Sequence, residues 1–152
     1  FFLRMIREKL RHSFRPLFWL LISKGYKTYL LMANNFHTYY PHPEGKNAEL
    51  APLVDSYCER LFSDYYCGEN KLLDFGEGYT HLKSNVASIT PEMRQKNEKI
   101  HFFETCNPTW NRGTELPCIG EINFSLLLSY PFSLWRKQRR KTKTQIAAVA
   151  CE

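Results

Sequence analysis

Apolar residues recur at helical spacing near the start of this 152-residue chain, and charged residues fill the positions between them. The apolar positions are Phe2, Leu3, Met5, Ile6 and Leu10. Intervals of three and four residues place most of them on one face, so residues 1–13 are predicted to form an amphipathic helix. Pro16 disfavours helical geometry at the residue before it, which predicts that the helix ends there.

The next segment, PLFWLLIS at residues 16–23, carries no charge and shows no alternation of apolar and polar residues. This pattern is typical of a strand that is buried on both faces, and a buried helix is the alternative that periodicity leaves open. Lys24 and Gly25 interrupt it, and helical spacing resumes from Tyr26 to Phe36. A membrane span needs about 20 continuous apolar residues. The stretch therefore predicts a buried strand followed by a helix rather than a span.

The rest of the chain gives five further elements. They are a helix over 47–66, a hairpin over 71–83, a helix from 90 to 97, and strands over 99–105 and 115–130. The hairpin is predicted to turn at Gly76 and Gly78, which tolerate positive φ angles. Thr90 suits the cap of a helix and Pro91 its first position, so a helix is predicted to start there.

Helices and strands are mixed along the chain, which predicts an α/β or α+β fold with a central mixed sheet flanked by helices. The length and a hydrophobic content of 43% suffice for one core, so residues 1–135 are expected to form a single domain. Residues 136–152 open with the basic run RKQRRKTKTQ and are predicted to be a disordered tail.

The net charge of +6 is unevenly distributed. Residues 1–43 carry seven basic and one acidic side chain, residues 44–121 carry eight and thirteen, and residues 122–152 carry six and one. Either the basic ends are solvated or dock on the acidic middle, or they contact nucleic acid or an anionic membrane through salt-dependent electrostatics. The basic residues of the tail are Arg136, Lys137, Arg139, Arg140, Lys141 and Lys143.

The cysteines and histidines form no metal-binding pattern. Cys58 and Cys67 are the nearest pair of cysteines and have eight residues between them, whereas zinc ligands are usually about two to four residues apart. Five cysteines are an odd number, which favours a reducing cytoplasm over a closed disulfide framework. The remaining catalytic candidates are Cys58 or Cys106 with His81 or His101, and the carboxylate pairs Glu69 with Asp74 and Glu115 with Glu121.

The loop CNPTWNRGT, residues 106–114, is the candidate ligand loop of the second half. It concentrates residue types that bind ligands through amides, a ring face and a guanidinium group. These residues are Asn107, Trp110, Asn111 and Arg112. The alternative is that Trp110 packs over the sheet and the loop has no ligand.

The order of the segments FFLRMIREKLRH, PLFWLLIS and YKTYLLMANNF resembles the second half of a GNAT-type acyltransferase domain. In that family a glycine-rich phosphate loop opens a central helix, and the backbone amides at the start of this helix hold the coenzyme A pyrophosphate. The helix leads to a buried strand and then to a second helix. The family's loop, R/Q-x-x-G-x-G/A, is expected immediately before Phe1. Because Met5 is the first methionine, the chain is interpreted as a fragment, and no secretion signal is expected in it.

The resemblance implies coenzyme A as a cofactor of the full-length protein, no cofactor for this fragment, and a small-molecule acyl acceptor as partner. The residues that it places on the coenzyme side are Tyr26, Tyr29, Asn34 and Asn35. Two positions depart from the family pattern, since its tyrosine falls on Leu31 and its closing Gly-Phe on Asn35-Phe36. Glu104, Glu121 and Tyr130 remain as alternatives for a general base, and no catalytic residue is assigned.

Three interpretations follow from the sequence. The first is a fragment of an acyltransferase-like protein that is inactive by itself. The second is a non-enzymatic binding module whose basic ends contact nucleic acid or an anionic membrane. The third is an interaction domain without a ligand. Whether the chain is an enzyme is left open at this point.

Overall fold

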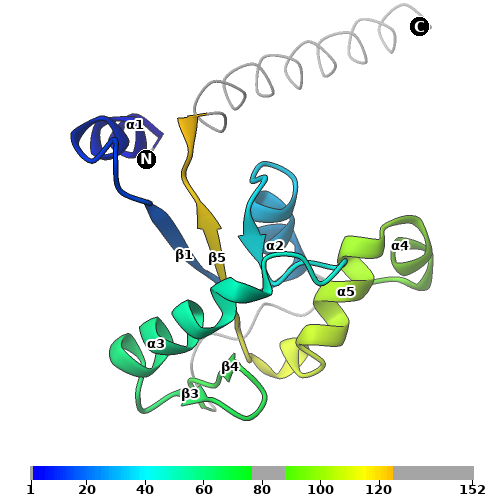
Figure 1. Cartoon of the computed structure of the whole chain (residues 1–152). Helices are drawn as coiled ribbons and strands as arrows, with labels where there is room; N and C mark the ends of the chain where they lie inside the picture. The colour runs from blue at the N-terminus through cyan, green and yellow to red at the C-terminus, as the bar shows by residue number, and fades with distance from the viewer. Residues whose placement is uncertain (1, 77–87, 125–152) are drawn as a thin grey trace, which may run out of the picture. The chain divides into compact units, whose positions relative to one another are not determined.

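The structure, a computed structural model, describes residues 2–76 and 88–124 (Figure 1). The chain divides into two compact units. One unit is Phe18–Glu121, and the other joins Phe1–Leu17 to Ile122–Glu152. The basic tail and the second half of the predicted strand 115–130 lie outside the described residues. Each unit is considered by itself.

The main sheet of the first unit has three strands in the order β1-β5-β2. They are β1 (Phe18–Ser23), β5 (Leu116–Glu121) and β2 (Tyr39–Tyr40). All pairs are antiparallel, with Phe18 opposite Glu121 and Tyr40 opposite Ile119. The prediction of a mixed sheet is therefore wrong for the described strands. The last of the described strands, β5, lies at the centre of this sheet, between β1 and β2.

Pro117 occupies this central strand without loss of a ladder hydrogen bond. The amides of Glu115 and Glu121 point to the same side of β5, because they donate to the carbonyls of Leu73 and Thr38 at 2.8 and 2.9 Å. Pairing direction alternates along an antiparallel strand, so Pro117 faces that side too. The two-residue strand β2 ends before it reaches Pro117. The missing N–H of this proline therefore falls where β5 has no β2 partner.

Helix α3 (Ala51–Leu61) covers one face of the sheet and is preceded by a 3₁₀ turn, Ala48–Leu50. It packs its inner side against Ile119 of β5. The buried cluster consists of Leu50, Val54, Cys58 and Ile119, with Phe18, Tyr40, Leu53 and Tyr66 packed around it. The predicted helix over 47–66 is thus confirmed for Ala51–Leu61, and its first turn is 3₁₀.

Helices α2 (Tyr26–Ala33) and α5 (Glu98–Cys106) pack against each other, and α2 lies against β1 and β5. The Tyr29 and Phe103 side chains are fully buried there, with ring centroids 5.9 Å apart. Phe36 follows α2 and lies over Gly120, whose Cα faces away from the side of Ile119. The sheet of this unit therefore has helices on both faces, as the layer prediction requires.

Lys99 at the start of α5 closes the end of α2. Its Nζ donates to the carbonyl of Ala33 at 2.6 Å and to Oδ1 of Asn34 at 3.0 Å. The last carbonyls of a helix lack partners within the helix and form its negative end. A lysine from a segment 65 residues away along the chain supplies both the donor and the charge.

A small hairpin stands beside the sheet. It consists of β3 (Tyr66–Cys67) and β4 (Leu72–Leu73). Leu73 also bridges to Glu115, just before β5. The sequence predicted Leu72 and Leu73 in a hairpin with a turn at Gly76, but the structure pairs them with the preceding segment. The predicted second strand of that hairpin lies outside the described residues.

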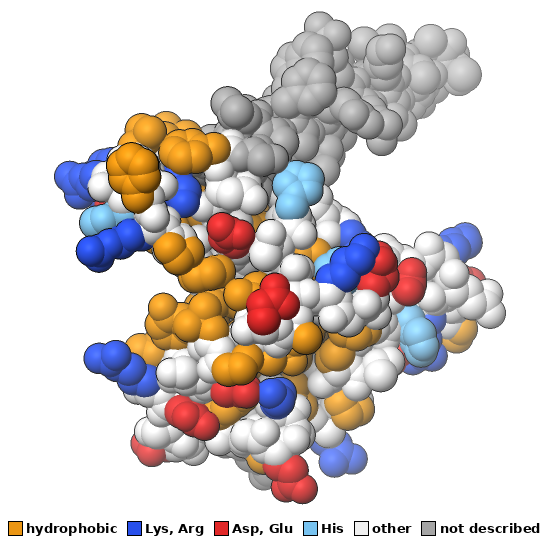
Figure 2. Space-filling model, in the orientation of Figure 1, with side chains coloured by type: hydrophobic (Ala, Val, Ile, Leu, Met, Phe, Trp, Pro, Cys, Tyr) orange, Lys and Arg blue, Asp and Glu red, His pale blue; other side chains and the backbone are white. Residues whose placement is uncertain are grey.

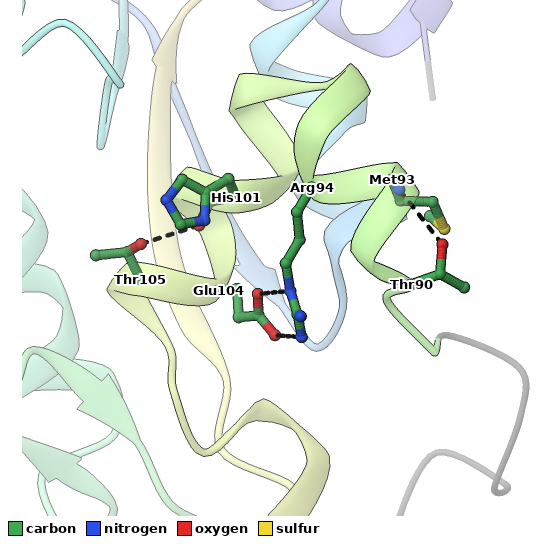
Figure 3. Close-up of polar contacts among 6 residues, drawn as sticks. All are labelled: Thr90, Met93, Arg94, His101, Glu104 and Thr105. Atoms are coloured by element: carbon green, nitrogen blue, oxygen red, sulfur yellow. Dashed lines mark hydrogen bonds and ion pairs between the residues drawn. The ribbon is translucent and has the colours of Figure 1, made fainter.

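Helices α4 (Pro91–Lys96) and α5 follow each other closely (Figure 3). Thr90 Oγ1 accepts the Met93 amide at 3.3 Å, which confirms the predicted cap. The prediction of a strand over 99–105 is wrong, because Asn97 Oδ1 accepts the Lys99 amide and begins α5 there. The apolar run of α5 also turns Ile100 and Phe103 inward at helical spacing.

The second unit contains helix α1 (Phe2–Arg11), and Ile122 donates its amide to the Leu17 carbonyl at 2.7 Å. The predictions of a helix over 1–13, a strand over 16–23 and a helix from Tyr26 are confirmed as α1, β1 and α2. The expected burial of the strand on both faces is wrong, because five of the six β1 residues are only half-buried. Within residues 2–76 and 88–124, no helix has the length and apolar character needed to cross a membrane.

The contact between Gly120 and Phe36 gives a stability prediction. A Cβ at position 120 would lie 2.5 Å from Cδ1 of Phe36, a ring that is 8% exposed and packs on Trp19. We expect Gly120→Ala to lower the free energy of unfolding by about 1–3 kcal/mol, as overpacking does. Urea unfolding followed by circular dichroism measures this.

Gly68→Ala is the matched control, because a Cβ there would meet no atom within 4 Å. It should change stability by less than about 0.5 kcal/mol. In a Phe36→Leu background the smaller side chain leaves room, so the cost of Gly120→Ala should fall. Equal effects of the two alanine substitutions would contradict the proposed packing.

Candidate functional site

The loop after α5 is held by a buried polar cluster. Asn107 is fully buried, and its Nδ2 donates to the Thr114 carbonyl at 2.9 Å. Thr114 Oγ1 donates to Asn107 Oδ1 at 2.6 Å, and Thr109 Oγ1 lies 2.8 Å from Thr114 Oγ1. These bonds bring the two ends of the loop together across seven residues. A 3₁₀ turn, Trp110–Arg112, lies between them, and Gly113 follows with a φ of 103°.

A pocket of about 350 Å³ opens between this loop and the β3–β4 hairpin. Its lining consists of Cys67, Asn70, Leu72, Asp74, Thr109, Arg112 and Thr114. The Leu73–Glu115 bridge ties the hairpin to the start of β5 and so fixes one wall against the other. A volume of this size is at the lower end of the range for small-molecule sites.

The pocket presents charges of both signs. The Arg112 guanidinium is exposed and makes no hydrogen bond or ion pair with the described residues. Asp74 uses Oδ1 to accept the Gly76 amide at 2.9 Å, and Asn70 uses Oδ1 to accept the Leu72 amide at 3.1 Å. A ligand could therefore meet guanidinium and amide donors together with a carboxylate. Such a set suits a small polar molecule with an anionic group directed at Arg112.

The far side of the hairpin is fixed by Asp55 of α3. Tyr66 donates to Asp55 Oδ1 at 2.6 Å, and Lys71 Nζ donates to Asp55 Oδ2 at 2.8 Å. Burial opposes ionisation of this carboxyl, but the bonds from Lys71 and Tyr66 outweigh it and lower the Asp55 pKa. Lys71 has a φ of 57°, so the turn of the hairpin bends sharply there. The network anchors the hairpin to α3 and thereby positions Asn70 and Asp74.

Of the four predicted ligand-loop residues, Arg112 alone lines this pocket in the described structure. The side-chain amide of Asn107 uses both its nitrogen and its oxygen in hydrogen bonds to Thr114, so Asn107 is a structural residue. Trp110 is half-buried and Asn111 is exposed, and neither lines the pocket. Sequence reasoning missed Asn70, because it comes from a segment far from the loop in the chain. Thr109 and Thr114 belong to the predicted loop, but their short hydroxyl side chains were not singled out as ligand-binding.

The residues that the resemblance placed on the coenzyme side have structural contacts in α2. The Tyr29 hydroxyl donates to the Pro41 carbonyl at 3.0 Å, and burial raises the pKa of this tyrosine. Tyr26 begins the helix, with Lys27 Nζ 5.9 Å from its ring centre. Asn34 accepts from Lys99, and Asn35 Nδ2 donates to the Leu31 carbonyl at 2.6 Å. Their assignment to the coenzyme side stays a prediction.

Glu104, Glu115 and Glu121 were considered for catalysis, and their surroundings differ. Arg94 holds Glu104 through two bonds of 2.5 and 2.7 Å between α4 and α5 (Figure 3). Glu115 and Glu121 are six residues apart on one extended segment, roughly 20 Å, and cannot act on one bond. Burial raises the Glu115 pKa, although Lys24 at 3.5 Å opposes the shift. Tyr130 lies outside the described residues.

The two candidate cysteines, Cys58 and Cys106, are not activated as nucleophiles. Burial raises the pKa of Cys58 to about 11 and that of Cys106 to about 11, so both thiols stay protonated near neutral pH. Among the described residues, neither is hydrogen-bonded to His101, and His81 lies outside them. The same residues contain no group of three His, Cys, Asp or Glu side chains that could hold a metal ion.

Comparisons with known proteins do not assign the chain to a family. Protein-family models, curated proteins and solved structures yield no significant match to the chain.

Proposed function

We propose that this chain belongs to an acyltransferase-like protein and forms its acceptor side. In this proposal the full-length protein transfers an acyl group from coenzyme A to a small polar acceptor, and residues 1–152 are inactive by themselves. The observation that carries the proposal is the polar pocket of about 350 Å³ between the hairpin and the 107–114 loop. The assignment to acyl transfer rests on the resemblance of the first 36 residues, which is an analogy of fold.

The order of the elements supports this proposal. Helix α1 is followed by the apolar strand β1, then by α2 and a turn that ends in Phe36. This is the order in which the family arranges its central helix, buried strand and second helix. Tyr26 and Tyr29 open α2 as the proposal requires, although Tyr29 is engaged with Pro41.

The open edge of β1 also supports a larger fold. Five of the six β1 residues are only half-buried, although the strand is apolar over most of its length. In the described part of the chain β1 pairs with β5 alone, and no described strand pairs with its other edge. An apolar edge strand of this kind is a place where a further strand adds. A sheet that continues beyond β1 fits an acyltransferase-like domain larger than these residues.

Pocket chemistry sets the class of acceptor. Arg112 can hold a carboxylate through paired N–H groups, and Asp74 can hold an ammonium group on the same molecule. Free α-amino acids carry both groups and are small enough for the volume. Acyl transfer to such a molecule requires a neutral amine, so a general base would have to come from elsewhere in the full-length protein.

The coenzyme part of the proposal is tested by calorimetry. We expect no measurable heat of coenzyme A binding to residues 1–152, because no phosphate loop is found in them. The full-length protein should bind coenzyme A. Tight coenzyme A binding or acetyl transfer by residues 1–152 would contradict the proposal, as would a full-length protein that binds no coenzyme.

The acceptor pocket is tested by NMR titration with free α-amino acids. We expect amide shifts confined to residues 70–74 and 109–114, and a loss of affinity of about tenfold in Arg112→Gln, since the carboxylate loses a charged partner. Arg60→Gln is the matched control, because Arg60 is exposed on α3 and does not line the pocket, and it should bind as the unaltered chain does. Identical affinities of the two variants would show that Arg112 does not bind the amino acid.

A further inference from the structure

Helix α1 carries apolar side chains on two different faces. Met5 lies on the buried face and is 9% exposed. Beside it Lys9, 6% exposed, donates Nζ to the Arg15 carbonyl at 3.0 Å and lies 5.6 Å from the ring centre of Phe124. Lys9 on this face therefore has its partners within the helix's own unit.

The second apolar face is open to solvent. Leu3 and Leu10 are 79% and 60% exposed, and a spacing of seven residues puts them on one side of the helix. Phe14 lies in the turn that follows and is fully exposed. Ser13 Oγ donates to the Leu10 carbonyl at 2.8 Å and holds this turn against the helix. Figure 2 shows hydrophobic side chains gathered over α1 with basic ones beside them.

Basic side chains border this apolar face. Residues 2–15 contain five basic side chains and one acidic, a net charge of +4. Arg7 and Arg11 have side chains 59% and 62% exposed, and Arg4 and Arg15 are exposed as well. Glu8, the one acid, lies 3.3 Å from Arg7 and 3.7 Å from Arg11. The face thus combines exposed large apolar groups with an excess of positive charge.

The end of the helix adds a notch of about 270 Å³, lined by Arg11, His12, Ser13, Phe14 and Arg15. Two guanidinium groups and an imidazole border it, next to the exposed ring of Phe14. Guanidinium groups bind phosphate oxygens through paired N–H donors. The notch has the size and charge for a phosphate group, with an apolar side chain placed beside it.

A lipid surface fits this combination better than a nucleic acid does. Both ligands present phosphates, and both would bind the arginines. Leu3 and Leu10 would bury no apolar surface against the phosphate backbone of a nucleic acid. An interfacial helix buries such side chains among the acyl chains of the lipid. The helix is too short to cross a bilayer and would lie along its surface.

We propose that α1 and the turn after it dock on an anionic phospholipid bilayer. Leu3, Leu10 and Phe14 enter the interface, and Arg4, Arg7, Arg11 and Arg15 contact lipid phosphates. The inference does not depend on acyl transfer, since it uses no residue of the pocket and needs no coenzyme. Its failure would leave the coenzyme and pocket tests untouched.

The test is sedimentation of the chain with vesicles of phosphatidylcholine alone or with phosphatidylserine added. We expect binding to the mixed vesicles, weak binding to phosphatidylcholine, and a loss on raising the salt concentration. The variant Leu3→Ser/Leu10→Ser/Phe14→Ser should bind mixed vesicles about tenfold more weakly, because the apolar contribution is removed. These side chains are exposed, and circular dichroism checks that α1 remains folded.

Leu61→Ser is the matched control, because Leu61 is 59% exposed against 60% for Leu10 but lies on α3 in the other unit. It should bind as the unaltered chain does. The basic tail is the same in every variant and cannot explain a difference between them. Equal binding by the triple variant overturns the proposal. Binding to RNA without binding to vesicles, or dimerisation through these side chains in light scattering, overturns it too.

Discussion

Strand β5 is the element on which the arrangement of the larger unit depends. It is buried over five of its six residues and pairs with β1 on one side and with β2 on the other. At its beginning, Glu115 also exchanges two backbone bonds with Leu73 of the hairpin, at 2.8 and 2.9 Å. Three segments from different parts of the chain are therefore aligned by one strand. Without it, neither the sheet nor the wall of the pocket would be fixed.

The two faces of β5 determine where the helices pack. Ile119 lies in the cluster under α3, while Gly120 leaves room for the ring of Phe36 after α2. A glycine in a central strand weakens it, but an aromatic ring laid over the gap restores part of the lost contact. Helix α5 is then attached to α2 by Lys99 and leads directly into the loop that starts at Asn107. The sheet thus positions the loop indirectly, because α2 packs on the sheet and α5 packs on α2.

The sequence predicted well those elements whose signals are local. The spacing of apolar residues in α1, the uncharged run of β1 and the Thr90 cap of α4 all lie within a few residues of the structure they specify. The segment 99–105 was misread, because aromatic and β-branched residues favour strands. Asn97 as a cap, with Ile100 and Phe103 three residues apart, was the available signal for a helix.

Other features depended on partners that a single sequence does not reveal. The strand β2 has two residues, Tyr39 and Tyr40, directly before Pro41. Its pairing with β5 is what defines it as a strand. The hairpin turn was predicted after Leu72 and Leu73, whereas it precedes them. Local sequence does not show that these residues pair with Tyr66 and Cys67. The same holds for the site. Arg112 was found from its loop, but the opposite wall comes from a segment about 40 residues earlier.

Amide hydrogen exchange of the unaltered chain tests the central role of β5 most directly. If β5 holds the unit together, the amides of residues 118–120 should be among the slowest to exchange and should open only with global unfolding. The amides of the β3–β4 hairpin should exchange earlier, because that sheet has two short strands. Exchange of residues 118–120 at the rate of the hairpin, with α3 still protected, would contradict this account.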